Sequence, residues 1–247
     1  MSGTGRNDDG HGRGLGNLLS GLAVAVGCVL FLGGFAWGAV EYKPYTVPTQ
    51  SMEPTVKAGD RVLAQRIDGG DVRRGDVVIF KDKAWGNVPM VKRVVGIGGD
   101  TVKCCDRGGK LTVNGQEIEE PYLHNTAAST TKFSATVPKD QLFLLGDERD
   151  VSLDSRVHLE DAANGSVPRS AVSARVDAVA WPLDGMLERP TGFKALPGGI
   201  SQPGPLTLVV GSVVAGTVLI VAGAAYGPLA RRFGRRRGVR GEAAGAR

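Results

Sequence analysis

Residues 91–100 read VKRVVGIGGD, an apolar stretch of strand-like composition that ends in a glycine turn. Valine and isoleucine dominate it, and such residues favour β-strands. Within this run lies a single lysine, Lys92, followed by Arg93. Side chains alternate along a strand, so Lys92 shares one face with Met90 and Val94 while Arg93 points to the other. The stretch therefore predicts a strand that places one lysine in apolar surroundings.

Short segments of the same composition recur on both sides of this strand, separated by Gly, Asp and Pro clusters. An Asn-Gly pair, Asn114 and Gly115, stands between strand-like flanks and predicts a hairpin turn. No segment between the two apolar runs described next has a helical period of useful length, so we expect a mainly β domain. The predicted strands are 61–67, 76–80, 91–97, 101–105, 110–113, 133–137, 141–145 and 171–181.

Two long apolar runs flank this β region. Residues 18–40 carry no charged side chain over 23 residues, enough to cross a hydrocarbon core of about 30 Å as a helix. Residues 205–230 form a second apolar run without a polar face. A cleavable signal peptide is the alternative for the first run, but its length and the aromatic residue Trp37 near its end favour a membrane anchor.

The formal net charge of +5 comes largely from six arginines within residues 231–240. Without this tail the chain is close to neutral, so its basic composition does not argue for nucleic-acid binding by the folded part. Positive residues favour the cytoplasmic side of a membrane, so we expect cytoplasmic tails at 1–17 and 231–247. Residues 41–203 are then extracytoplasmic, with a flexible segment at 191–204 rich in Gly, Ser and Pro.

The chain has three cysteines, of which Cys28 lies in the first apolar run. Cys104 and Cys105 are adjacent, and we expect two reduced side chains on opposite faces of a strand; a vicinal disulfide is the strained alternative. No Cys or His spacing suits a zinc site. We expect neither a metal nor a cofactor.

Two further stretches carry the chemistry. Residues 48–55 read PTQSMEPT just beyond the first apolar run, and residues 146–156 read GDERDVSLDSR. Together with the lysine strand, and in this order behind a membrane anchor, they resemble the bacterial type I signal peptidases. These are membrane-bound serine proteases that remove signal peptides from exported proteins. The resemblance covers residues 44–182, and the C-terminal apolar run is similar to the Gram-positive or actinobacterial form of the family.

The resemblance implies a role for each matching residue. Ser51 would be the nucleophile and Lys92 the general base, oriented by Ser152. The Ser51 backbone N–H and the hydroxyl of Thr49, where the family usually has Ser, would form the oxyanion hole. We call the stretches 48–55, 91–100 and 146–156 the first, second and third box. Four charged residues of the third box would support the site: Asp147, Arg149, Asp154 and Arg156.

The family also implies the surroundings of the enzyme. The fold would be an antiparallel, barrel-like β domain with transmembrane helices at both ends. Substrates would be secretory preproteins cleaved after an Ala-x-Ala sequence, with S1 and S3 pockets that we place along 77–80 and 88–91. We expect contact with the lipid bilayer, to which Met52 beside Ser51 would be suited, no nucleic acid, and a monomer.

Other interpretations remain open at this stage. His124 or His158 could serve Ser51 in a Ser-His-Asp triad, and a lone lysine on an edge strand could simply point into water. Residues 129–132 fit the S-x-x-K motif of penicillin-binding enzymes, although its companion motifs are missing. The protein could also be a Ser-Lys protease of the SOS-repressor type, or a non-catalytic membrane-anchored β module.

Overall fold

A computed structural model describes residues 9–105, 108–124 and 127–242, with side chains from residue 16 to residue 226. The chain divides into two compact units. One is Glu41–Gly204, called here the β domain, and the other combines residues 1–40 with residues 205–247.

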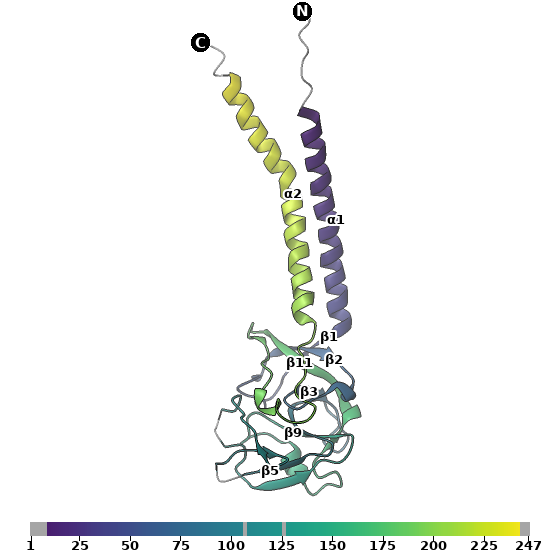
Figure 1. The fold of residues 1–247 in the computed structure, drawn as a ribbon, viewed down its shortest axis with the longest axis vertical. Coiled ribbons are helices and arrows are strands. Elements are labelled where there is room, and N and C mark those ends of the chain that lie inside the picture. Colours follow the sequence, from purple (N-terminus) through teal and green to yellow (C-terminus); the bar gives the residue numbers. More distant parts are fainter. Residues whose placement is uncertain (1–8, 106–107, 125–126, 243–247) are drawn as a thin grey trace, which may run out of the picture. The chain divides into compact units, whose positions relative to one another are not determined.

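The β domain is built mainly from an eight-stranded antiparallel sheet (Figure 1). Its strands follow the order β1-β2-β11-β3-β4-β9-β10, and β12 pairs with β11. The sequence is rich in Val, Ile and Leu on both faces of the central strands, which suits strands covered on two sides. The strands are β1 (Tyr42–Thr46), β2 (Arg61–Arg66), β3 (Val77–Phe80), β4 (Met90–Ile97), β9 (Gln141–Leu145), β10 (Val167–Pro168), β11 (Val172–Trp181) and β12 (Gly185–Met186).

A second sheet has the order β7-β6-β5-β8. Its strands are β5 (Thr101–Cys104), β6 (Thr112–Val113), β7 (Gln116–Glu117) and β8 (Phe133–Thr136). β6 and β7 form the hairpin predicted from the Asn-Gly pair, because Asn114 and Gly115 both adopt positive φ, 54° and 80°. That conformation is the one a two-residue hairpin turn requires. The mainly antiparallel β fold expected from the sequence is therefore confirmed.

Three apolar clusters form the core. One of them, around Val62, Val77 and Val176, also takes in Met52 from the loop after β1. Among the described residues, three 3-10 helices lie between strands and a fourth follows β12; they are η1 (Gly69–Asp71), η2 (Ser155–His158), η3 (Arg169–Ala171) and η4 (Thr191–Phe193).

The segment after β12 differs from the prediction of a flexible 191–204. Phe193 is fully buried and Leu196 is nearly so, and both belong to the core cluster around Phe143. Ser201 Oγ also donates to the buried carboxylate of Asp76 at 2.6 Å. Composition alone suggested a linker, but two apolar side chains are sufficient to dock the segment on the domain.

The cysteine pair also differs from the prediction, because Cys104 and Cys105 are joined by a disulfide. β5 ends at Cys104, so the alternation that would place neighbouring side chains on opposite faces does not extend to Cys105. The two sulfur atoms can therefore meet at the end of the strand. Cys28 is a free cysteine.

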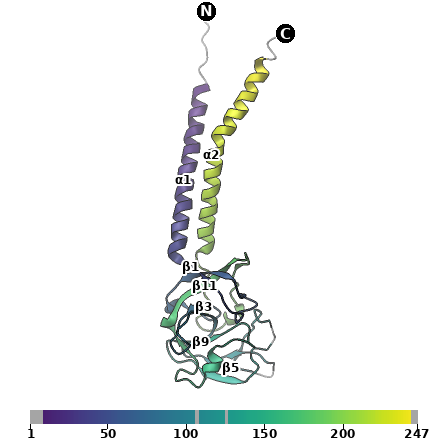
Figure 2. The same cartoon turned by 180° about the vertical axis from the view of Figure 1, so that it is seen from behind.

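The second unit contains α1 (Asp9–Glu41) and α2 (Leu206–Glu242), which run side by side in opposite directions (Figures 1 and 2). Gly16–Glu41 and Leu206–Tyr226 are long and apolar enough to cross a membrane. Small residues let the backbones approach closely, and Ser20 Oγ donates to the Gly223 carbonyl at 2.7 Å. Of the predicted tails, 1–17 and 231–247, the structure describes the backbone of 9–17 as part of α1 and that of 231–242 as part of α2, with side chains only at residues 16 and 17; the rest lies outside the described residues.

Candidate active site

Ser51 and Lys92 meet at the centre of the candidate site. Ser51 lies in a turn between β1 and β2, and Lys92 lies on β4. Lys92 Nζ is 2.7 Å from Ser51 Oγ and donates a hydrogen bond to it. Both residues are buried, with exposed fractions of 8% and 3%. At this separation a neutral amine can instead accept the serine proton, which is the geometry that a nucleophile and its base require.

The turn that carries Ser51 is fixed from two directions. Met52 inserts its fully buried side chain into the core, and the Glu148 N–H donates to the Ser51 carbonyl at 3.2 Å. The expectation that Met52 suits a membrane-facing site is therefore wrong, because its side chain is an anchor inside the protein. The buried Met52 side chain fixes the position of the turn, and so holds the Ser51 hydroxyl beside Lys92.

The surroundings of Lys92 shift its protonation equilibrium. The pKa of Lys92 is lowered to about 8, with burial as the largest cause; the carboxylates of Asp154 and Asp147 act to raise it, and Arg156 acts to lower it. Desolvation disfavours the ammonium form, which explains the direction. A substantial fraction of neutral amine is then present at mildly alkaline pH.

Thr49 lies beside the nucleophile, with its Oγ1 3.4 Å from Ser51 Oγ. Its exposed side chain adjoins the buried Ser51 hydroxyl. This is where an oxyanion donor is expected, although the role itself stays a prediction.

Ser152 is brought to the same place, but its hydroxyl forms no hydrogen bond with the residues that the structure describes. Its side chain is buried, and Ser152 Oγ has no partner among the described residues. A side chain at Gly146 would collide with both Ser152 Oγ and the Ser51 carbonyl. The glycine therefore allows Ser152 to approach the nucleophile, while the expected bond to Lys92 is not formed here and its orienting role stays a prediction.

The four charged residues of the third box do not pair with one another as a single set. Asp154 pairs with Arg156, accepting from its Nε at 2.8 Å, and also accepts from the Gly146 N–H at 3.0 Å. Asp147 instead accepts two hydrogen bonds from Arg93, at 2.8 and 2.6 Å.

Arg149 finds a partner that the sequence analysis did not identify. It donates to the carboxylate of Glu120 at 2.6 and 3.2 Å. Glu120 contacts Arg149 and Tyr122 contacts Arg93, yet neither Glu120 nor Tyr122 lies in the three boxes, and neither gave a signal in the sequence. Thr55, whose hydroxyl donates to Asp147 at 2.5 Å, is the last residue of the first box, and Arg93 was visible as a charged residue inside an apolar strand.

His158 and the S-x-x-K motif lie apart from Ser51. Among the described contacts, Ser51 Oγ has Lys92 and Thr49 as its neighbours, whereas His158 stacks on Trp85 and pairs with Asp161. Ser129 lies in a loop and not at a helix start, and its hydroxyl accepts from Arg156 at 3.4 Å. These observations favour the lysine over a histidine as the base.

A comparison with protein families agrees with this geometry. The family model described as signal peptidase, peptidase S26, matches residues 17–181, which include every residue of the candidate site. The chain belongs to the signal peptidase family. Membership makes it a serine endopeptidase that processes signal peptides.

Several known signal peptidases are similar to the chain. It is 32% identical over 199 residues to a probable signal peptidase I of Mycobacterium leprae, covering 57% of this chain and 68% of that protein. For signal peptidase I of Mycobacterium tuberculosis the values are 30% over 192 residues, covering 57% and 65%, so about a third of each mycobacterial protein is not matched. Signal peptidase IB of Staphylococcus aureus is 32% identical over 181 residues, covering 66% of this chain and 88% of that protein.

A crystal structure of a signal peptidase I from Enterococcus faecalis is 26% identical, with a TM-score of 0.34. The match covers 47% of this chain and 96% of that one.

Proposed function

We propose that this signal peptidase cleaves signal peptides with Ser51 as the nucleophile and Lys92 as the general base. The supporting observation is the 2.7 Å contact between Lys92 Nζ and Ser51 Oγ in buried surroundings that favour a neutral amine. A structural lysine would instead pair with a carboxylate, as the neighbouring Arg93 does with Asp147.

The reaction follows from this arrangement. Neutral Lys92 accepts the Ser51 proton as Oγ attacks the scissile carbonyl carbon, and the charge develops on the carbonyl oxygen. The Ser51 N–H and the Thr49 hydroxyl stabilise that oxygen. The protonated lysine then donates its proton to the leaving amine, which leaves an acyl group on Ser51. Water, deprotonated by Lys92, releases the signal peptide and regenerates the enzyme.

The substrate and its surroundings complete the proposal. The preproteins carry small residues in an Ala-x-Ala pattern before the cut, as the family resemblance implies. The two apolar helices anchor the enzyme in the cell membrane as a monomer, with the β domain outside and both termini in the cytoplasm. The apolar spans of 26 and 21 residues within the two helices and the arginine-rich C-terminus support this topology.

The decisive experiment measures hydrolysis of an Ala-x-Ala peptide by the full chain in detergent. Ser51→Ala should abolish cleavage, because it removes the nucleophile. Lys92→Arg should also abolish it, since a guanidinium does not lose its proton at working pH. Lys103→Arg, the same change at an exposed lysine of β5, is the matched control and should keep the wild-type rate.

An active, folded Lys92→Arg enzyme would contradict the proposed base. A folded wild-type chain that cleaves no such peptide would favour a non-catalytic β module instead. Circular dichroism and thermal melting of each variant separate loss of chemistry from loss of fold.

A further inference from the structure

Glu120 stands out as a buried carboxylate that lies outside all three sequence boxes. Its side chain is 4% exposed and faces the guanidinium of Arg149, which is 3% exposed. Arg149 Nη2 and Nη1 donate to the two carboxylate oxygens at 2.6 and 3.2 Å, and Tyr122 Oη donates to the first of them at 2.5 Å. A buried charge is retained only where such partners satisfy it.

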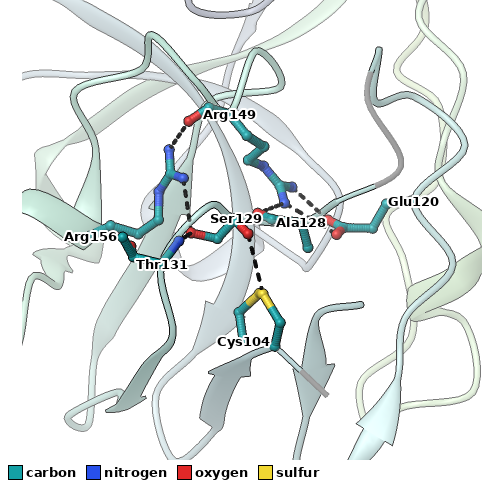
Figure 3. The surroundings of a disulfide bond; sticks show 8 residues. Cys104, Glu120, Ala128, Ser129, Thr131, Arg149 and Arg156 are labelled. Atoms are coloured by element: carbon teal, nitrogen blue, oxygen red, sulfur yellow. Dashed lines mark hydrogen bonds and ion pairs between the residues drawn. A yellow bond between two sulfur atoms is a disulfide. The ribbon is translucent and has the colours of Figure 1, made fainter. Parts of the chain in front are cut away.

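Arg149 transmits this contact to the turn beside the nucleophile. Its Nε donates to the Gly146 carbonyl at 2.9 Å, and its Nη1 donates to the Ala128 carbonyl at 2.7 Å. Figure 3 shows the guanidinium held between Glu120 and Ala128, with Arg156 bonded to the Arg149 carbonyl. Fixing Arg149 therefore fixes the turn at 146–149.

The same turn contacts Ser51 directly and contacts the strand that carries Lys92. The Glu148 N–H holds the Ser51 carbonyl. Asp147 binds the guanidinium of Arg93, the residue next to Lys92 on β4. A displacement of this turn would move the nucleophile and the strand that carries the base by different amounts.

Tyr122 closes the network from its other end. Its ring lies under the Arg93 guanidinium, 3.9 Å from the centroid, while its hydroxyl holds Glu120. The segment 120–122 thus contacts the arginine of β4 and the arginine of the turn together. Arg93, Tyr122 and Thr55 also line a cavity of about 250 Å³, so solvent lies close to one side of the network.

We propose that Glu120, together with Tyr122, is a positioning residue that holds the 146–149 turn and thereby keeps Ser51 and Lys92 at hydrogen-bonding distance from each other. This inference rests on the proposed Ser-Lys chemistry. Glu120 acts through Arg149, and Tyr122 acts through Arg93 and Glu120; neither residue has a described contact with Ser51 or Lys92.

The titration of Lys92 reports on this positioning. The charged groups that act on its amine are Asp154, Asp147 and Arg156, and burial is the largest influence on its pKa. Loosening the turn admits water to the amine and so raises the pKa of Lys92 towards its ordinary value. The neutral base then becomes available only at higher pH.

The test compares Glu120→Gln with the wild type by following kcat and KM for an Ala-x-Ala peptide across pH. Glu119→Gln is the matched control, because this neighbouring carboxylate is 75% exposed and pairs with Lys110 at the surface. We expect Glu120→Gln to lose up to about 100-fold in kcat near pH 8, the scale of a small misplacement of reacting groups. KM should change little, because the carboxylate is buried.

The pH profile distinguishes positioning from a merely structural role. In Glu120→Gln the rising limb of the profile should move to higher pH, and alkaline assay should recover part of the rate. Tyr122→Phe, which keeps the ring under Arg93 but removes the hydroxyl, should move the limb in the same direction by less. It also carries the test if Glu120→Gln does not fold.

A folded Glu120→Gln enzyme whose rate rises over the same pH range as that of the wild type would overturn the inference, whether or not its rate fell. If Glu120→Gln does not fold, a Tyr122→Phe enzyme whose pH profile matches the wild type would do the same. Failure of the underlying chemistry looks different, because then the wild type itself would be inactive or Lys92→Arg would be active.

Discussion

Lys92 and Arg93 are neighbours on one strand, yet the surroundings of Arg93 stabilise its positive charge, whereas those of Lys92 favour the neutral amine. Alternation sends Arg93 to the face where Asp147 accepts two of its hydrogen bonds, so it stays a buried cation. Lys92 points to Ser51, and its described hydrogen bond is to that neutral hydroxyl. Only an amine can lose its proton near neutral pH, so the order Lys-Arg places the titratable group where a base is needed.

The first prediction concerns the pH dependence of the wild-type enzyme. Because the active form of Lys92 is neutral and its pKa is lowered to about 8, kcat/KM should rise with pH below that value and level off above it. The rise should be about tenfold per pH unit well below the pKa, as for one essential base. The measurement uses a peptide that has no group titrating between pH 6 and 10.

The outcome depends on which group is the base. An apparent pKa near 10.5 in the pH profile, the ordinary value for lysine, would show that burial does not lower the pKa of Lys92. An apparent pKa near 6.5 would indicate a histidine.

How much of the site could be predicted differs between residues. Ser51 and Lys92 follow from their boxes, and the structure brings them together. The link from Glu120 to Arg149 joins residues 29 positions apart, and local patterns carry no information about such contacts. Ser152 was expected to hold Lys92 through its hydroxyl, but that hydroxyl has no hydrogen-bond partner among the described residues.

At the scale of elements, amino-acid composition was sufficient to predict the positions of strands in the middle of the sheet. The strand expected at 141–145 has those bounds, and β4 differs from the expected 91–97 by one residue. β1 was missed, because it carries Pro44 at the edge of the sheet, where a missing N–H is tolerated. β10 and β12, at two residues each, are too short for any pattern to register.

The two helices lead to the second prediction, made at this scale. A Cβ at Gly34 would lie 3.3 Å from the Ser212 Cβ, close to the separation found in disulfides. In a Cys28→Ser background, the pair Gly34→Cys and Ser212→Cys should therefore cross-link readily under mild oxidation. Proteolysis of the β domain followed by non-reducing electrophoresis detects the link, because the two helix fragments stay joined.

The neighbouring glycine supplies the control. A Cβ at Gly33 has no atom within 4 Å, so Gly33→Cys with Ser212→Cys should cross-link poorly. Equal yields from both pairs would show that the helices do not pack through this seam.

At the scale of the whole molecule, a polar β domain is inserted between two apolar helices. A membrane core accommodates helices but excludes a polar domain of this kind, so we expect the domain to lie on one side. Both helices would then cross in opposite directions, with the two termini on the other side. The arginine-rich end predicts that this other side is the cytoplasm, since cationic residues are retained there.

The last prediction tests this topology with protease added to intact spheroplasts of cells that express the full chain with a tag after Arg247. The protease should cut within Glu41–Gly204 and spare the tag, because six arginines near the C-terminus favour a cytoplasmic location for that end. Lysed spheroplasts, in which the tag becomes accessible, control for its resistance. Loss of the tag from intact spheroplasts would place the C-terminus outside, and the second helix would then not cross the membrane. An uncut β domain that is cleaved only after lysis would place the catalytic unit in the cytoplasm, where it could not meet exported preproteins.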